Sequence, residues 1–97
     1  MLHHVVMWTL HDGDDKPARV AEVVRLLRGC AALVPGIERF EVGFAQPGLD
    51  CTCDVVLNST FTDRAALAAY QSHPDHVAIK PFMKAAVAAR QCMDYED

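Results

Sequence analysis

Basic residues are scarce in this chain. It has 9 lysines and arginines against 13 aspartates and glutamates, which gives a net charge of −4. Proteins that bind nucleic acids or anionic membranes gather cations that neutralise phosphates. Arg19, Arg25 and Arg28 lie at helical spacing but are interleaved with Glu22, which indicates a solvated helix face. We therefore expect neither a nucleic acid nor a membrane as partner.

Long apolar runs are also missing. No stretch approaches the roughly 20 residues that a membrane-spanning helix needs. The opening residues Met1–Val5 lack the basic start of a signal peptide, so we expect a cytoplasmic protein. A disulfide framework is not expected there, and the C-x-C pair lacks further zinc ligands at motif spacing. The sequence thus predicts free thiols at Cys30, Cys51, Cys53 and Cys92.

Common catalytic and cofactor signatures are absent too. The chain contains no G-x-S-x-G, no P-loop and no glycine fingerprint for dinucleotides, so we expect no cofactor and no metal. What is present suits a compact core, since 52% of the 97 residues are hydrophobic. This length fits one domain, residues 1–97, and a domain so small is often helped by oligomerisation.

The hydrophobic pattern predicts an alternation of strands and helices. Strands are expected at 2–10, 37–45, 52–61 and 90–95, where β-branched, aromatic and alternating residues concentrate. An i, i+3, i+4 pattern predicts a helix over 17–33. Two further helical pieces are expected, from Thr62-Asp63 to Ser72 and from Pro74 to Ala88. The order is the α+β, ferredoxin-like β-α-β-β-α-β motif.

Such a sheet carries helices on one face only. The first strand holds apolar residues on both faces, which indicates that its second face is covered as well. A second copy of the chain is the simplest cover, because two-fold dimers are the commonest oligomers. We expect a homodimer that packs through this sheet face into a dimeric α/β barrel.

The segment Tyr70–His76 is the best candidate for a site. Proline blocks the helical conformation of the residue before it, so a bend at Pro74 can turn Tyr70 and His76 into one cavity. In the first turn of a helix and partly buried, His76 is expected to be neutral and to serve as a general base. Tyr70 stays protonated and can donate to a carbonyl or enolate oxygen. The structural alternative is a buried Tyr–His hydrogen bond that only fixes the bend.

The other histidines have plainer explanations. His73 is expected to cap the second helical piece; an H-x-x-H metal site with His76 lacks an evident third ligand. His4 alternates onto the face of Val6 and Trp8, where it either reaches the cavity or is a satisfied core histidine. We expect a small, mainly apolar pocket between sheet and helices. Its predicted lining is His4, Val6, Trp8, Leu27, Leu57, Tyr70, His76 and Ile79.

Several short motifs, in the right order over nearly the whole chain, resemble the Dabb family, the stress-responsive α/β-barrel domain. The most specific is the Y-x-x-H-P-x-H string within Ala69–His76. The others are the HVVMW strand His4–Trp8, Val34–Ile37, Glu41–Gly43, Asp54–Leu57 leading to Phe61, and the closing Met93–Tyr95. The resemblance implies a ferredoxin-like subunit that dimerises through its sheet.

The resemblance also implies roles for single residues. In plant olivetolic acid cyclase, a member of this family that closes a linear polyketide, the catalytic histidine and tyrosine match His76 and Tyr70, and a pocket histidine matches His4. Aromatic positions of that enzyme's cavity fall on Val24, Leu27 and Val87, so the same substrate is not implied. Two functions stay open. One is cofactor-free acid–base chemistry, of cyclase or lyase type, on a small carbonyl compound. The other is a non-catalytic protein with a stress-related role or a small apolar or aromatic ligand.

Overall fold

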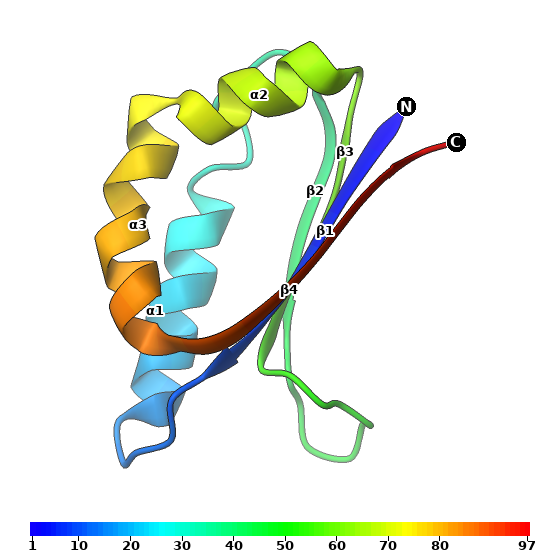
Figure 1. Ribbon diagram of the computed structural model, residues 1–97. Helices are drawn as coiled ribbons and strands as arrows, with labels where there is room; N and C mark the ends of the chain where they lie inside the picture. Colours follow the sequence, from blue (N-terminus) through cyan, green and yellow to red (C-terminus); the bar gives the residue numbers. More distant parts are fainter.

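The computed structural model describes all 97 residues, Met1–Asp97. The elements follow the ferredoxin-like order, with the second helical region divided in two (Figure 1). The strands are β1 (Leu2–Leu10), β2 (Ile37–Phe44), β3 (Val55–Phe61) and β4 (Val87–Glu96). The helices are α1 (Lys16–Arg28), α2 (Arg64–Ser72) and α3 (Pro74–Ala86). The α+β, ferredoxin-like fold expected from the sequence is confirmed.

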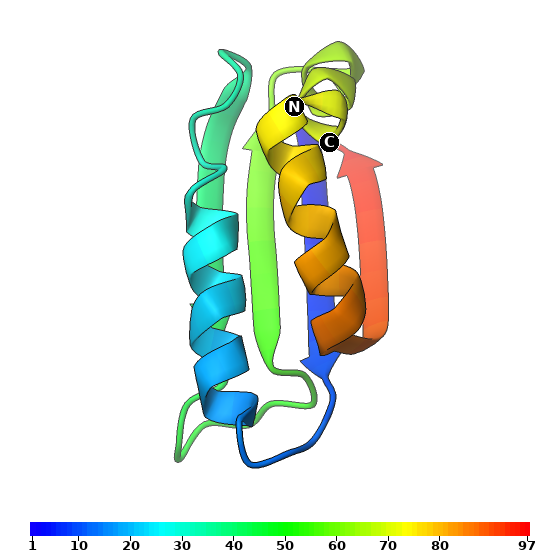
Figure 2. The same cartoon turned by 90° about the vertical axis from the view of Figure 1, so that its left-hand side faces the viewer.

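The four strands form one antiparallel sheet in the order β2-β3-β1-β4. All three helices lie on one face of it, as Figure 2 shows with the helices in front of the strands. The register places Val6 opposite Leu57 of β3 and His4 opposite Asp94 of β4. Side chains alternate between the faces of a strand, so these four residues face the helices.

The core lies between the sheet and the helices and has two parts. One joins β1 and β3 to α1 through residues that include Val6, Leu57 and Leu27. The other surrounds Phe61 and Tyr70 beneath α2. Each fully buried aliphatic or aromatic side chain of this kind contributes roughly 1.5–3 kcal/mol of hydrophobic stabilisation. The two parts hold α2 and α3 at a fixed angle above the sheet.

The first helix is shorter than expected. The prediction extended it to residue 33, but α1 ends at Arg28. After α1 the backbone hydrogen bonds span three residues instead of four. The N–H of Cys30 donates to the carbonyl oxygen of Leu27, and the N–H of Ala31 donates to that of Arg28. Gly29, the first residue after α1, weakens its continuation, because glycine costs about 1 kcal/mol in a helix interior relative to alanine. The turns that follow still bury Cys30.

Two strand boundaries also differ from the prediction. The third strand begins at Val55 rather than residue 52, because Asp54 turns its carboxylate to the backbone N–H of Leu10 and to Lys16. The last helix ends at Ala86 rather than Ala88, and β4 begins at Val87 rather than residue 90. The alanines there favour helix, but Val87 pairs with Leu10 and the sheet prevails.

The bend between α2 and α3 lies where the sequence places it. Helix α2 ends at Ser72, and Pro74 is the first residue of α3. His73 between them is extended, and its Nδ1 accepts a hydrogen bond from the backbone N–H of Asp75. The predicted capping role of His73 is therefore confirmed. The axes of the two helices consequently diverge over the sheet (Figure 1).

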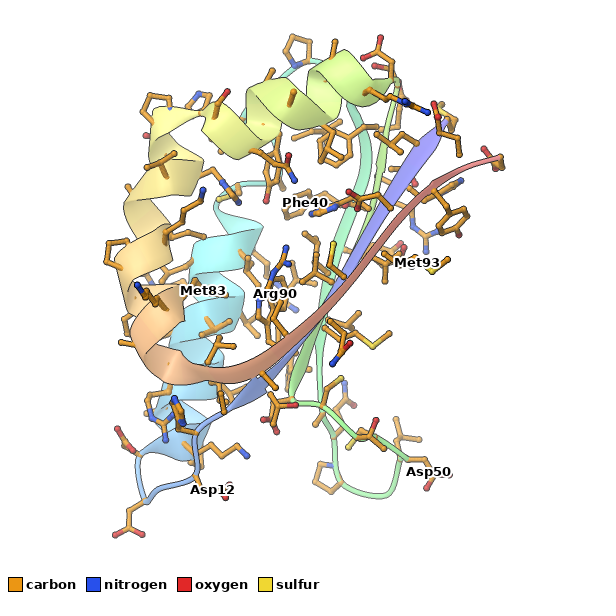
Figure 3. All side chains as sticks on the ribbon, in the orientation of Figure 1. Asp12, Phe40, Asp50, Met83, Arg90 and Met93 are labelled. Carbon is orange, nitrogen blue, oxygen red and sulfur yellow. The ribbon has the colours of Figure 1, made fainter.

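No helix of this chain combines the length and the apolar character that a membrane crossing requires. The sheet face opposite the helices, which we call the open face, is uncovered. Met7, Met93 and Tyr95 there are 43%, 67% and 46% exposed, and Figure 3 shows Met93 pointing away from the helices. His3 stacks on Tyr95, with 4.7 Å between ring centroids. An open face rich in large apolar side chains is typical of a protein interface.

Candidate functional site

A cavity of about 1070 Å³ lies between α3 and the helix-facing side of β1 and β4. It is lined by 18 residues, of which 11 are hydrophobic. Cavities of this size and character are typical of small-molecule sites. All eight residues that the sequence assigns to a pocket lie around this one cavity: His4, Val6, Trp8, Leu27, Leu57, Tyr70, His76 and Ile79.

Tyr70 is the most unusual side chain of the site. It is 1% exposed, and its hydroxyl is the only buried side-chain polar atom of the chain without a hydrogen-bond partner. The rings of Phe40 and Phe61 pack around it at centroid distances of 5.7 and 5.3 Å. Burial raises the pKa of Tyr70, so the hydroxyl keeps its proton. An unpaired buried hydroxyl costs about 1–3 kcal/mol, which a ligand oxygen would recover.

His76 lies beside Tyr70, with 4.6 Å between the ring centroids. No hydrogen bond joins the two, so the Tyr–His bond of the structural alternative is not formed. Instead, His76 Nδ1 lies 3.1 Å from the carbonyl oxygen of Gln71. A carbonyl only accepts, so Nδ1 carries the proton and Nε2 of the neutral ring is an acceptor.

The surroundings of His76 favour that neutral form. Burial lowers the pKa of His76, and the positive charges of Lys80 and Arg90 lower it further, against an opposing contribution from the Gln71 carbonyl. The ring also lies in the first turn of α3, where the helix dipole disfavours a cation. The site thus combines a neutral imidazole with a protonated phenol.

A third polar group comes from β1. His4 is 4% exposed, and its Nδ1 lies 2.5 Å from Oδ1 of Asp94 on β4. The carboxylate accepts a hydrogen bond from Nδ1–H of His4. Sequence reasoning gave Asp94 no role. Alternation along β4 would have placed Asp94 on the same face as Arg90. The register that brings Asp94 opposite His4 on β1 cannot be read from the sequence.

One group of side chains offers the donor atoms of a metal site. His4, Cys92 and Asp94 bring a nitrogen, a sulfur and an oxygen within 4.8 Å of one another. In a tetrahedral zinc site, nitrogen and oxygen ligands at about 2.0–2.1 Å from the metal stand roughly 3.3 Å apart. The His4–Asp94 distance of 2.5 Å is that of a hydrogen bond instead. The residues as they stand do not fit a zinc ion.

The remaining lining was not foreseen. Because β4 begins three residues earlier than predicted, Val87, Ala88 and Ala89 contribute to the cavity. Three basic residues, Lys80, Lys84 and Arg90, also line it. His73 and Val24 do not line this cavity. The sequence shows the helical spacing of Lys80 and Lys84. That Arg90 lies in β4 and lines the cavity depends on the tertiary structure.

The comparison with protein families gives one match. The Dabb family model, described as the stress-responsive A/B barrel domain, matches residues 2–97. No protein of curated function matches the sequence.

Solved structures of similar fold include dimers. A dimeric ferredoxin-like protein of unknown function from Bacteroides fragilis is 27% identical, with a TM-score of 0.82 over 99% of this chain and 95% of its own. Another, from a Jannaschia species, is 28% identical, with a TM-score of 0.79 over 99% and 98%. A Dabb family protein from Mesorhizobium loti is 24% identical, with a TM-score of 0.73 over 99% and 95%.

Proposed function

The chain belongs to the Dabb family, and from this premise we propose that it acts on a small carbonyl compound by acid–base chemistry that needs no cofactor. The observation that carries the proposal is the hydroxyl of Tyr70, buried without a hydrogen-bond partner beside the neutral His76. Buried polar groups without a partner are rare in folded proteins, and a catalytic role is one of the explanations for them. A proton acceptor next to a hydrogen-bond donor is what enolisation requires.

In the proposed reaction, Nε2 of His76 takes a proton from the carbon next to a carbonyl group. The electron pair of the broken C–H bond forms an enolate, whose oxygen accepts a hydrogen bond from Tyr70. The enolate carbon then attacks a second carbonyl of the same molecule, which closes a ring. In a lyase reaction the enolate instead re-forms the carbonyl and a C=C bond, and the bond from the β carbon to a leaving oxygen breaks. The proton on His76 passes to the oxygen that gains charge, so the site returns to its starting state.

The apolar walls support this chemistry. Trp8, Leu57 and Ile79 keep much of the cavity free of polar groups. A hydrogen bond from Tyr70 to a developing oxyanion is stronger in such surroundings than in water. We propose that His4, held by Asp94, binds a further oxygen of the compound as its proton acceptor, for instance an enol or a phenol.

A second candidate is a non-catalytic protein that binds a small apolar or aromatic ligand, with a stress-related role. The volume of the cavity and its mainly hydrophobic lining favour it, since both features suit retention of a ligand. In this case Tyr70 and His76 would orient the ligand without moving a proton. The two candidates differ in one observable, the exchange of protons next to the carbonyl.

We propose a homodimer that packs the open faces of two sheets together. Two solved structures that are 27% and 28% identical to this chain are described as dimeric. The open face supplies apolar area through Met7, Met93 and Tyr95, which are large and exposed in the single subunit. The cavity lies on the other side of the sheet, so dimerisation leaves the ligand site separate in each subunit.

The cytoplasm is the compartment that we propose. All four cysteines are free thiols, and Cys30 is buried. Reducing surroundings keep thiols in this state.

Deuterium exchange tests the catalytic proposal. Phenylacetone in D2O is a suitable probe, because it is a small aromatic ketone whose α-proton signals can be followed by NMR. We expect the protein to accelerate their loss and the His76→Ala variant to fall to the buffer rate with its fold intact. His11→Ala is the matched control, because His11 is exposed and lies outside the cavity. An equal rate for His76→Ala and the wild type would overturn the catalytic proposal. Mass spectrometry of a co-purified molecule, together with no exchange, would favour the second candidate.

A further inference from the structure

The basic side chains of this protein differ in whether they have a partner within the chain. The chain has 9 lysines and arginines. Arg28 donates to the carbonyl oxygen of Val42. Five others form ion pairs with carboxylates: Lys16, Arg19, Arg25, Arg39 and Arg64. Lys80, Lys84 and Arg90 remain, and these three have neither a carboxylate nor a carbonyl partner.

These three unpaired cations occur at one place. All of them line the cavity, and none of its 18 lining residues is acidic. Lys80 and Lys84 are one helical turn apart on α3, and Arg90 approaches from β4. Figure 3 shows Arg90 in the space between α3 and the sheet. The three residues are exposed, so they form a basic rim where the cavity opens to solvent.

The rim is positively charged although the chain as a whole is negatively charged. The chain as a whole carries a net charge of −4, yet its unpaired cations surround the mouth of a mainly apolar cavity. Like charges held close together repel one another. An anion placed among them removes this repulsion and gains charge-assisted hydrogen bonds.

The rim also acts on the interior of the site. The positive charges of Lys80 and Arg90 contribute to the lowered pKa of His76, after burial as the larger cause. The unpaired hydroxyl of Tyr70 is a second, independent sign of a ligand in the same cavity. A molecule that satisfied both features would reach from the basic rim to the buried phenol.

We propose that the ligand of this cavity is an amphipathic anion, with a carboxylate or phosphate at the basic rim and an apolar body inside. The proposal rests on the proposed function for the location of the reacting carbonyl, which lies on the body of the molecule near Tyr70 and His76. The substrate is then a small oxo acid, or a carbonyl compound that carries a phosphate in place of the carboxylate. Neutral ketones would enter the same cavity but bind more weakly.

A matched series of probes tests the head group without any turnover. Decanoate, decyl phosphate, decanol and decylamine share one alkyl chain and differ in charge. Calorimetric titration should give decanoate or decyl phosphate a dissociation constant about tenfold below that of decanol, as expected for several solvent-exposed ion pairs. Decylamine should bind most weakly. The tighter of the two anions identifies the head group as carboxylate or phosphate.

Two variants assign the preference to the rim. Replacing Lys80, Lys84 and Arg90 by glutamine should bring the affinities for decanoate and decanol within about twofold of each other, because exposed charges carry the difference. The matched control removes the same number of charges at Arg19, Arg25 and Arg64 and should keep the full preference. Loss of the preference in both variants would assign it to net charge and overturn the proposal. Equal affinities of the anions and decanol for the wild type would overturn it as well.

The two proposals fail in different experiments. Head-group preference without deuterium exchange retains the anionic ligand and rejects the catalytic role. Exchange without head-group preference retains the catalytic role and rejects the anionic ligand. Single substitutions keep the test free of folding effects: Lys84→Gln alone, at an exposed position on α3, should lower the preference part of the way.

Discussion

His4 and Asp94 are 90 positions apart in the chain, yet Nδ1 of His4 lies 2.5 Å from Oδ1 of Asp94. The contact exists because β1 and β4 are neighbours in the sheet, with these two residues in register. It places a proton on Nδ1 and holds the orientation of a ring that lines the cavity. A residue without an assigned role in the sequence thereby becomes the positioning group for a buried histidine.

The first prediction concerns this contact. Asp94→Asn should lower the free energy of unfolding by about 1 kcal/mol, because a partly exposed charge-assisted hydrogen bond is replaced by a neutral one. The ¹⁵N shifts of the His4 ring should also change, since its tautomer is no longer fixed by a carboxylate. Asp50→Asn, in the exposed loop between β2 and β3, is the control and should change neither quantity. Unchanged His4 shifts in Asp94→Asn would contradict the positioning role.

The second prediction separates stability from function at Tyr70. Tyr70→Phe removes a hydroxyl that has no hydrogen-bond partner. Denaturant titration should therefore show an unfolding free energy that is unchanged or higher by up to about 1 kcal/mol. The exchange rate of phenylacetone should fall at least about tenfold, because the enolate loses its donor. Tyr95→Phe, on the open face, should leave this rate unchanged. A clear loss of stability in Tyr70→Phe would show that the hydroxyl has a structural partner.

The third prediction follows from the lowered pKa of His76. Its folded pKa lies below the unfolded value of about 6.5, so the unfolded state binds more protons between the two. The stabilisation that comes from burying His76 as a neutral ring is fully present above about pH 6.5 and is lost as the pH falls through the folded pKa. Urea titrations should show a smaller loss of stability on acidification for His76→Gln than for the wild type. His11→Gln, at an exposed position, is the control and should follow the wild-type curve. The exchange rate should fall over the same acidic range, as the base becomes protonated. Parallel pH curves for His76→Gln and the wild type would contradict the assignment.

The fourth prediction addresses the open face. Met93→Glu places a charge in the proposed interface and should convert the dimer to monomers, because a buried unpaired charge costs several kcal/mol, about 3–5. Sedimentation velocity gives the mass directly. Phe82→Glu is the matched control, since Phe82 is an exposed apolar residue of α3 on the helix side. It should remain dimeric. Monomeric wild-type protein, or a dimer that survives Met93→Glu, would place the interface elsewhere.

Local chemistry in the sequence was enough to place the main elements. Alternation defined β2, and the helical spacing of Val20, Val23 and Leu27 defined α1. The missing N–H of Pro74 located the bend between α2 and α3 and explained the cap at His73. Each of these features depends on neighbours within a few residues, which is why a single sequence reveals them. The prediction was wrong at the ends of α1 and α3 and at the start of β3. At Gly29 helix and turn are close in free energy, and Val87 and Asp54 contact residues that are distant in the sequence.

The sequence by itself therefore determined a ferredoxin-like fold and brought Tyr70 and His76 to either side of one bend. Only the tertiary structure decided that Tyr70 lacks a partner, that His4 meets Asp94, and that the three unpaired cations share one rim. For Tyr70 and the two lysines the physical reason is the packing of α2 and α3 on the sheet, and for His4, Asp94 and Arg90 it is the pairing of β1 with β4. The register between the two ends of the chain depends on the packing of the whole sheet, and no local pattern encodes it.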